Sequence, residues 1–408
     1  LEDIMHYMSM KSVEGYVQER NDIQYQRIRN SEVLVHLAQK QFLKSFTEYK
    51  EQYLSGNKDA KFNFPEGGII SQFTNLEIVQ NMEYANPVEE MATITKISPV
   101  GKTVGGIPDK EGMGLDARNV HRSYFGNIDP VDTAEGGNIG ITQQLTVDAY
   151  LTSARGLFGL KELKNDEGAG ILSTTLSMIP FIENNEGARM IMAGNQGKQM
   201  LPLKNPEPPI VGTGYESLLT NVLSDSFIKR SPCAGKVTNV TIDYIEINCN
   251  KGGKKKVDIT PAQLKSGSGV NTLSSFKPIV IKGQSVKNNQ VIAEGACMAG
   301  GTISLGRNLA TCYMPYQGYN FEDGLIINDR LVHDDKLTSL HGIDIEISVD
   351  SKDRVLYVAE IGADTKKGEV LFRKSAGDID ELLGYQEEEE EGVDVYEGQI
   401  IVKSPGGR

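Results

Sequence analysis

The chain has 408 residues, of which 39% are hydrophobic and 24% charged, a composition typical of a soluble globular protein with two to four domains. Taken alone, its formal net charge of −13 argues against a nucleic-acid binder, because a negative surface repels phosphate; the charge is uneven, however, so local patches decide. No stretch is long and apolar enough to span a bilayer, and no secretory leader opens the sequence, so we expect a cytoplasmic protein without a membrane anchor.

Acidic residues and cysteines are placed unevenly along the chain. Residues 387–391 are five consecutive glutamates, a run more typical of a solvated loop than of a protein-contact tail. The four cysteines, Cys233, Cys249, Cys297 and Cys312, show no metal-knuckle spacing, and the five histidines do not cluster with them. We therefore interpret all four as reduced thiols.

The first predicted element is a long helix over residues 31–54, with Ser31 as its N-cap. Apolar side chains recur there at steps of three and four residues, which predicts one packing face. These residues are Val35, Ala38, Phe42, Phe46, Tyr49 and Tyr53. Residues 55–69 are turn-rich and predict a connector, followed by a shorter helix at about 71–83. The chain is thus expected to begin with a helical segment.

The middle of the chain changes character twice. Glycine and proline are dense from 86 to 140; such long irregular segments are usually functional or disordered, and the arginines and aromatics here favour function. Residues 205–350 are rich in β-branched side chains, with strand character over 236–249 and a hairpin turn at 250–253. We interpret Lys254–Lys256 after this turn as solvated rather than as a nucleic-acid patch. The fold class is therefore α+β.

Two adjacent carboxylates, Glu322 and Asp323, precede the apolar run 325–327 within "GYNFEDGLII" at 318–327, and this run is expected to be buried. Adjacent residues of a strand point to opposite faces, so at least one of the two acids should face a cleft. A carboxylate in that position suits Mg²⁺, which binds oxygen directly or through water. A turn acid with a capping role is the alternative.

A second candidate segment, residues 186–203, reads "EGARMIMAGNQGKQMLPL". It presents Arg189, Asn195, Lys198 and Gln199 among apolar residues that can supply a rigid mount. Such donors suit phosphate and sugar oxygens, although an ordinary polar surface would give the same pattern.

A third candidate segment spans residues 115–141. Arg118 and His121 precede two aromatic residues, an arrangement that suits a nucleic-acid channel. Glu135 and Asn138 flank two glycines, which let the backbone approach a ligand closely. No Walker-type phosphate loop occurs here, so the glycines alone are a weak signal.

Together these segments resemble one family, the β (second-largest) subunit of multisubunit DNA-dependent RNA polymerases. The matching stretches follow the family's order from about residue 20 to 345. They are "RIRNSE" (27–32), "ARNVHRSYFGNIDPVDTAEGGNIG" (117–140), "IPFIENNEGARMIMAGNQGKQMLPL" (179–203), "PIVGTGYE" (209–216) and "LGRNLATCYMPYQGYNFEDGLIINDRLVHDDKLTSLH" (305–341). An ordered series of this length is far more specific than any one motif.

The resemblance implies roles for the candidate residues. Glu322 and Asp323 would face the second, nucleotide-borne Mg²⁺, and Arg189 would lie near the phosphates of the incoming nucleotide; these three form the expected catalytic set. The expected substrate and nucleic-acid set is Arg27, Arg29, Arg118, His121, Glu135, Asn138, Asn195, Lys198 and Gln199. Of these, Asn195 and Gln199 would approach the growing RNA end.

The resemblance also implies partners. No Asp-x-Asp-x-Asp arrangement occurs in this chain, and in the family that triad, which holds the first Mg²⁺, belongs to the β′ subunit. We therefore expect a chain that is catalytically silent alone. Its expected partners are β′-like subunits, the remaining β polypeptide, DNA template, RNA transcript and NTPs, with an initiation factor as a further candidate. A split β subunit of the giant bacteriophage type, in the bacterial host cytoplasm, is favoured over an excerpt of a longer protein.

The family's architecture suggests four regions. Residues 1–85 would be a helical segment with a connector, and 86–204 the fork-loop and active-site wall region. Residues 205–345 would be a hybrid-binding region with part of a double-psi β-barrel, and 346–408 a flap-like β region with the acidic loop. A non-catalytic polymerase-like binding or inhibitor module is the alternative function; an unrelated metal-dependent hydrolase would need a self-sufficient metal cluster, which the sequence lacks.

Several positions depart from the family pattern. Lys198 stands where arginine is common and Gln196 where methionine is common. Residues 86–100 resemble the rifamycin-binding segment, but Thr93 and Thr95–Lys96 occupy its His and Arg positions. We therefore expect the assembled enzyme to be insensitive to rifamycins.

Overall fold

The computed structural model describes residues 21–23, 26–57, 59–76, 79–101, 106–107, 113–153, 155–159, 170–265, 271–342, 345, 347–349, 353–360, 363–375, 393–396 and 399–404. The chain divides into two compact units, residues 1–342 and 343–408. Helices and antiparallel sheets both occur in the first unit, which confirms the α+β class. The finer division into four regions stays a prediction.

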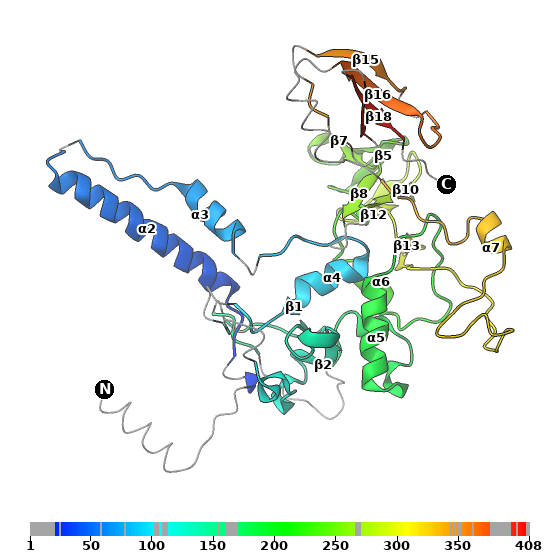
Figure 1. Cartoon of the computed structure of the whole chain (residues 1–408), viewed down its shortest axis with the longest axis horizontal. Coiled ribbons are helices and arrows are strands. Elements are labelled where there is room, and N and C mark those ends of the chain that lie inside the picture. Colours follow the sequence, from blue (N-terminus) through cyan, green and yellow to red (C-terminus); the bar gives the residue numbers. More distant parts are fainter. Residues whose placement is uncertain are drawn as a thin grey trace. The chain divides into compact units, whose positions relative to one another are not determined.

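The first unit begins with two paired helices (Figure 1). Helix α2 (Asn30–Leu54) has 25 residues, a length of about 37 Å, and confirms the predicted long helix. Its N-cap is Arg29, so Ser31 is not the cap. Helix α3 (Glu66–Thr74) begins inside the predicted connector and ends before most of the helix predicted at 71–83. The amide of Gln72 in α3 donates to Gln41 Oε1 in α2 over 3.0 Å.

The buried face of α2 is not the predicted one. Its buried residues follow steps of four: Val33, Leu37, Gln41 and Ser45. Val35 is 67% exposed, and the rings of Phe42 and Phe46 stack on each other while staying half exposed. Periodicity identifies an apolar face but not the element that covers it, and in the described residues α3 packs beside Gln41 rather than on the aromatic stripe.

Helix α4 (Pro87–Thr95) lies inside the segment that was predicted to be irregular. Asn86 caps it by accepting from the backbone N–H groups of Val88 and Glu89, and Pro87 occupies the first turn, where no N–H donor is needed. The chain then enters a three-stranded sheet of order β1-β3-β2. Its strands are β1 (Lys96–Ile97), β2 (Ile128–Thr133) and β3 (Gln143–Leu145).

After α5 (Gly187–Lys198) and α6 (Tyr215–Leu219), the first unit is dominated by short strands. They are β4 (Ile228–Arg230), β5 (Gly235–Val240), β6 (Tyr244–Cys249), β7 (Gly253–Asp258), β8 (Ala262–Lys265), β9 (Asn271–Ser274), β10 (Lys277–Pro278), β11 (Ser285–Val286), β12 (Val291–Glu294), β13 (Met298–Ala299) and β14 (Thr302–Ile303), before the short helix α7 (Arg330–His333). The predicted hairpin is confirmed, with Cys249 opposite Gly253. Its core side chains Val237, Ile245 and Ile247 are fully buried.

None of the sheets formed by the described residues closes into a barrel. The largest sheet of the first unit has the order β11-β5-β6-β7, and the others have two or three strands. The double-psi barrel therefore stays a prediction.

Two of the four cysteines are joined, which corrects the prediction of four reduced thiols. Cys233 and Cys249 form a disulfide with their Cα atoms 5.8 Å apart. Cys233 lies two residues before β5, and Cys249 ends β6 opposite Gly235 of β5, so the strand pairing brings the two thiols together. Cys297 and Cys312 are free, and burial raises the pKa of the Cys297 thiol.

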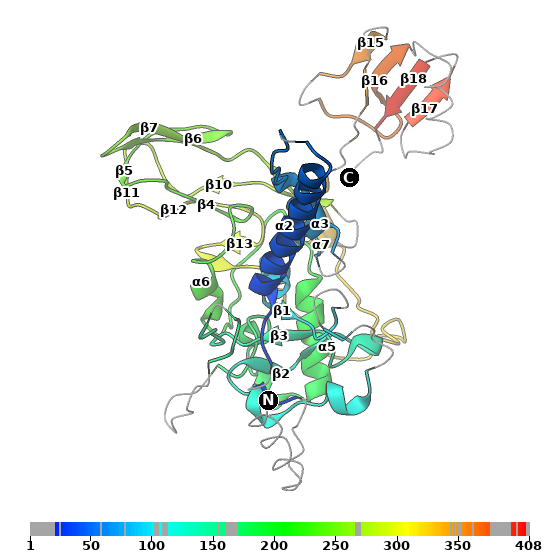
Figure 2. The same cartoon turned by 90° about the vertical axis from the view of Figure 1, so that its left-hand side faces the viewer.

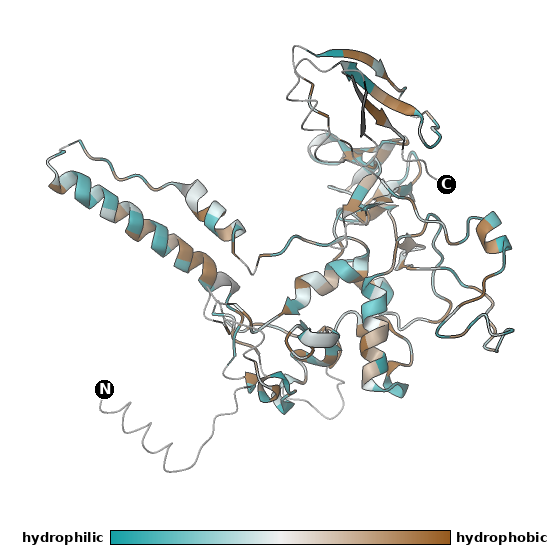
Figure 3. Cartoon of the chain, viewed as in Figure 1, coloured by the Kyte–Doolittle hydropathy of each residue, from teal (hydrophilic) through white to brown (hydrophobic). Residues whose placement is uncertain are grey.

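The second unit holds one sheet of order β15-β16-β18-β17 (Figure 2). Its strands are β15 (Arg354–Val358), β16 (Val370–Ser375), β17 (Val393–Tyr396) and β18 (Gln399–Lys403). Lys374 of β16 is buried and pairs with Asp353 over 2.8 Å. Every residue of the edge strand β15 is exposed, including the hydrophobic ones (Figure 3). The predicted acidic loop at 387–391 lies outside the described residues, so the start of a flap stays a prediction.

Among the helices of the described residues, none combines the length and the apolar character that crossing a membrane requires.

Candidate functional site

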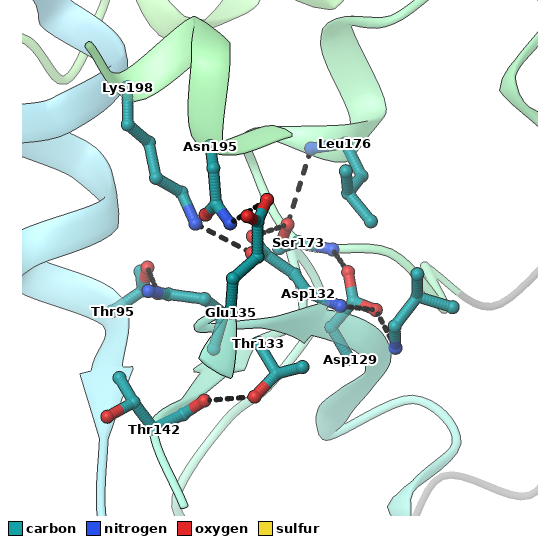
Figure 4. Close-up of polar contacts among 12 residues, drawn as sticks. Thr95, Asp129, Asp132, Thr133, Glu135, Thr142, Ser173, Leu176, Asn195 and Lys198 are labelled. Atoms are coloured by element: carbon teal, nitrogen blue, oxygen red, sulfur yellow. Dashed lines mark hydrogen bonds and ion pairs between the residues drawn. The ribbon is translucent and has the colours of Figure 1, made fainter. Parts of the chain in front are cut away.

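A buried ion pair joins the end of α5 to the end of β2 (Figure 4). The Nζ atom of Lys198 lies 2.6 Å from Asp132 Oδ1, and the two side chains are only 17% and 2% exposed. The other carboxylate oxygen of Asp132 accepts from the hydroxyl of Ser173 over 2.7 Å. A buried carboxylate needs such partners to stay charged, so this pair fixes where α5 ends relative to the sheet.

Asp129 organises the bend that carries Asp132. Its Oδ1 atom accepts from the backbone N–H groups of Val131 and Asp132 over 2.7 and 3.0 Å, and its Oδ2 atom accepts from the N–H of Ser173. Burial raises the pKa of Asp129, while these backbone hydrogen bonds pull the pKa down. One carboxylate therefore holds both the β2 bend and the loop that supplies Ser173.

Asn195 and Glu135 meet on the exposed side of the same cluster. The Asn195 amide donates to Glu135 Oε1 over 3.1 Å, and both side chains are partly or fully open to solvent. The structure thus brings together three predicted residues from two separate segments, Glu135 from 115–141 and Asn195 and Lys198 from α5. Gln199 follows directly as the exposed C-cap of α5.

Asn86 ties α4 to the carboxyl end of α5. While its Oδ1 atom caps α4, its Nδ2 group donates to the backbone carbonyls of Gly197, Lys198 and Met200 over 3.2, 2.9 and 2.8 Å. Asn86 is fully buried. One side chain therefore satisfies groups at the start of one helix and at the end of another, which would otherwise lack partners.

Arg189 lies in the first turns of α5, away from this buried anchor. Its side chain is exposed, and its Nη1 atom contacts the sulfur of Met192 at 3.6 Å. Further along α5, Gly194 is buried, and a Cβ there would lie 3.0 Å from Leu176. Close packing at Gly194 and the ion pair at Lys198 hold the helix, whereas Arg189 is open to a ligand.

Arg118 and His121 make contacts within the chain. Arg118 Nη1 donates to the carbonyls of Gly137 and Ile139 over 2.8 and 3.2 Å, which shapes the loop around the predicted Asn138. Gly140 closes this loop with φ +71°, and a Cβ there would lie 2.6 Å from the Arg118 carbonyl oxygen. His121 Nδ1 accepts from the backbone N–H of Ser123. Arg118 thus joins the loop around Asn138, whereas His121 organises the turn at Ser123.

Arg27 and Arg29 lie at the start of α2. Arg27 pairs with Glu32 over 3.1 Å, with both side chains about one-third exposed, and Arg29 is the helix N-cap. The backbone of Arg27 also forms an antiparallel bridge with Leu157, so this pair is anchored at the start of α2 and to the 157 segment.

The segment around Glu322 and Asp323 differs from the prediction. It is not a strand: both acids have left-handed backbone, with φ 50° and 65°. The apolar run after them is not buried either, since Leu325 is 88% exposed and Phe321 before the acids is 77% exposed. Asn320 folds the preceding turn by donating to the Met314 carbonyl, and the local turn replaces strand pairing.

Both acids are exposed side chains. Among the described residues, no hydrogen bond or ion pair joins them to α5, and no group of three or more His, Cys, Asp or Glu side chains could hold a metal ion. The acids and Arg189 are therefore not brought together by contacts within the described parts of this chain.

Sequence reasoning missed the supporting residues of the α5 anchor. Asp129, Asp132 and Ser173 were not singled out as site residues. Asn86 precedes a proline and a run with helical propensity, which is an N-cap signal. Its second role, at α5, depends on a contact over more than 100 residues that no local pattern reports.

Comparison with known proteins gives two ordered matches. Residues 80–151 match RNA polymerase Rpb2, domain 3, and residues 230–404 match RNA polymerase Rpb2, domain 6. The first match contains α4, β2 and the 137–140 loop, and the second contains the β-rich part and the acids at 322–323. The chain is similar to a piece of an RNA polymerase β subunit.

Relatives from several organisms carry the name DNA-directed RNA polymerase subunit beta. The one from Chlorobium chlorochromatii is 26% identical over 77% of this chain and 28% of its own length. The one from Gloeobacter violaceus is 29% identical over 67% of this chain and 29% of its own length. The one from Prochlorococcus marinus is 28% identical over 76% of this chain and 33% of its own length. The chain thus spans about a quarter to a third of these β subunits.

Proposed function

We propose that the chain is part of a DNA-dependent RNA polymerase, in which it helps to position the NTP, the second Mg²⁺ and the RNA–DNA hybrid for nucleotidyl transfer. The observation that carries the proposal is the pair of Rpb2 matches in chain order, at 80–151 and 230–404. Similarity to β subunits over most of the chain supports it. A giant-phage split β subunit remains the source that we propose.

Helix α5 supplies the donors in this proposal. Phosphoryl transfer depends mainly on positioning and on neutralisation of developing charge. Arg189 would contact nucleotide phosphates, and Asn195 and Gln199 the RNA end. Lys198 is occupied by Asp132, so it acts as a positioning residue that holds the helix, while Asp132 and Ser173 hold Lys198.

Glu322 and Asp323 supply the type of ligand that the second Mg²⁺ needs, but too few ligands to hold it alone. Carboxylate oxygens are the donors that Mg²⁺ accepts, and exposed acids suit contact through water. Two adjacent acids cannot complete an octahedral site, so the principal ligands would lie on a β′-like subunit. Mg²⁺ would supply neutralisation of triphosphate charge there; this chain's part is to place two carboxylates beside it.

Assembly is the first test. Purification of the chain from its source should bring down a partner with an aspartate triad, together with the remaining β polypeptide. Template-directed nucleotide addition should require that partner. A complex that assembles yet never adds nucleotides would favour the alternative, a polymerase-like binding or inhibitor module.

The acids are tested in the reconstituted complex. Asp323→Asn removes the charge and suits a left-handed position, which asparagine tolerates better than alanine. It should slow nucleotide addition about tenfold or more while leaving assembly intact. Asp334→Asn, at an exposed acid of the same segment, is the matched control. Equal rates for Asp323→Asn and the control would remove the assigned role.

Arg189 is tested through the nucleotide requirement. Arg189→Ala should raise the KM for NTP, because a charge-assisted phosphate contact is lost, and Arg189→Lys should restore part of it. An unchanged KM in Arg189→Ala would contradict the placement of α5 at the triphosphate.

A further inference from the structure

Positive charge is concentrated in one β module of an otherwise acidic chain. Residues 228–287, from the start of β4 to just after β11, contain eleven Lys or Arg and three Asp or Glu. The whole chain nevertheless carries −13. Sheet surfaces that serve only solubility usually mix both signs, so this segregation calls for a functional explanation.

Strand register places three of these lysines on one face of the sheet β11-β5-β6-β7. Lys236 of β5 lies opposite Asn248 of β6, which lies opposite Lys254 of β7. Lys256 lies two residues beyond Lys254 and therefore points to the same side. The other face of the sheet packs on the core through Val237, Ile245 and Ile247, so the lysine face is the outer one.

This face is flat, polar and open. All three lysines are exposed, and the spacing of strands puts Lys236 and Lys254 about 10 Å apart with Lys256 about 7 Å from Lys254. Glu246, the acid between them, pairs with Lys254 over 3.1 Å. Its pKa is lowered first by the hydrogen bond from Thr238 and then by Lys254, so it stays ionised and offsets one of the three charges.

An aromatic ring belongs to the same face. Lys256 Nζ lies 4.4 Å from the centroid of the Tyr244 ring, and Tyr244 is half-buried. Further exposed lysines lie near the sheet, Lys251 in the turn between β6 and β7 and Lys282 and Lys287 on the two sides of β11 in sequence. Lysines that track a backbone beside an aromatic side chain are the arrangement that binds nucleic acid without sequence preference.

We propose that this outer face, defined by Lys236, Lys254, Lys256 and Tyr244, binds the phosphodiester backbone of a nucleic acid. This proposal replaces the sequence-based interpretation of Lys254 and Lys256 as solvated side chains, because the register adds Lys236 and Tyr244 to the same face. The face contains none of the residues assigned to nucleotide positioning. The proposal rests on the hybrid-binding part of the proposed function, to which residues 205–345 were assigned, and names the side chains that would contact the nucleic-acid backbone there. The acidic remainder of the chain repels phosphate and would confine a polyanion to this module.

The test is equilibrium binding of the full chain to fluorescein-labelled (dT)20 and to a labelled 20-bp duplex, by anisotropy across a salt series. Lys236→Gln/Lys254→Gln/Lys256→Gln should weaken binding more than about tenfold at 50 mM NaCl. It should also lower the slope of log K against log salt by roughly 2 for the single strand or roughly 3 for the duplex. Whichever probe binds more tightly identifies the form of nucleic acid.

The control removes the same charge elsewhere. Lys40→Gln/Lys44→Gln/Lys50→Gln replaces three exposed lysines of α2 and should leave affinity and salt slope nearly unchanged, with both variants matched in thermal unfolding. The proposal is overturned if the two triple variants lose equal affinity, if neither probe binds, or if poly-L-glutamate competes better than (dT)20. Loss of nucleotide addition in Arg189→Ala without loss of (dT)20 binding separates this proposal from the previous one.

Discussion

Single side chains carry much of the connection between segments that are distant in sequence. Asn86 uses its carbonyl oxygen for α4 and its amide hydrogens for the end of α5. Asp132 likewise connects β2 with both Ser173 and Lys198. Because these groups are buried, loss of one leaves partner groups without hydrogen bonds, and that cost exceeds the value of the bonds themselves.

Asn86→Ala should destabilise the protein by about 2–4 kcal/mol. The estimate combines the loss of a helix N-cap, about 0.5–2 kcal/mol, with buried carbonyls left without donors, about 1–3 kcal/mol. Urea unfolding measures this loss of stability. Asn86→Ser keeps only the capping acceptor, so its free energy of unfolding should lie between those of the wild type and Asn86→Ala. A loss below about 1 kcal/mol for the alanine variant would show that α5 does not need this amide.

Glu89 predicts a pH dependence of stability. Burial, followed by the hydrogen bond and charge of Glu83, raises the pKa of Glu89 from 4.5 to about 7. Between these values the folded state binds more protons than the unfolded state, so this group makes the free energy of unfolding fall as pH rises from 4.5 to 7. Urea unfolding at several pH values measures this dependence. Glu89→Gln should abolish the fall in the free energy of unfolding, whereas Glu48→Gln, at an exposed position of α2, should keep it.

At the scale of elements, the hairpin β5–β6 is closed by a covalent bond. The disulfide Cys233–Cys249 spans 16 residues, and constraint of a loop of that size in the unfolded chain stabilises by about 3 kcal/mol. Cys233→Ala/Cys249→Ala should lower the free energy of unfolding by that order, and reduction of the wild-type chain should do the same. Cys312→Ala, at an exposed free thiol, should change nothing.

Local sequence patterns predicted where helices and hairpins occur better than they predicted which residues are buried or paired. The helix over α2 and the hairpin β6–β7 followed from periodicity and turn residues. The covered face of α2, the buried state of residues 325–327 and the free state of Cys233 were predicted wrongly, because each depends on what packs against a segment. In the candidate site, Glu135, Asn195 and Lys198 could be singled out from sequence, but Asp129 and Ser173 act only through long-range contacts.

At the scale of the whole molecule, the first unit leaves an apolar segment uncovered. Residues 308–330 are exposed apart from Asn320 and Gly324, and they include Tyr313 at 98% and Leu325 at 88% exposure. Monomeric proteins rarely leave so many large apolar side chains in one exposed stretch. Since the chain spans only a quarter to a third of its relatives, we propose that further polypeptide covers this segment in the assembled enzyme.

The isolated chain should therefore self-associate. Sedimentation velocity should show a sedimentation coefficient that rises with protein concentration. Tyr313→Ser/Phe321→Ser/Leu325→Ser should remove most of that rise, because burial of large apolar side chains drives the association. A wild-type chain that stays monomeric at tens of micromolar would contradict the need for a covering partner.

The hydrogen bonds that the Asn86 side chain makes with both α4 and α5 have a consequence for inhibitor resistance. Helix α4 belongs to the segment that resembles a rifamycin site, yet it carries none of the donors proposed to face the nucleotide. The buried Asn86 side chain hydrogen-bonds both the first turn of α4 and the end of α5. A change in the tilt of α4 should therefore move α5 as well. Under the proposed polymerase function, substitutions selected along α4 for resistance to an inhibitor would then also change the rate of nucleotide addition through α5, even where the inhibitor and the substrate never touch the same atom.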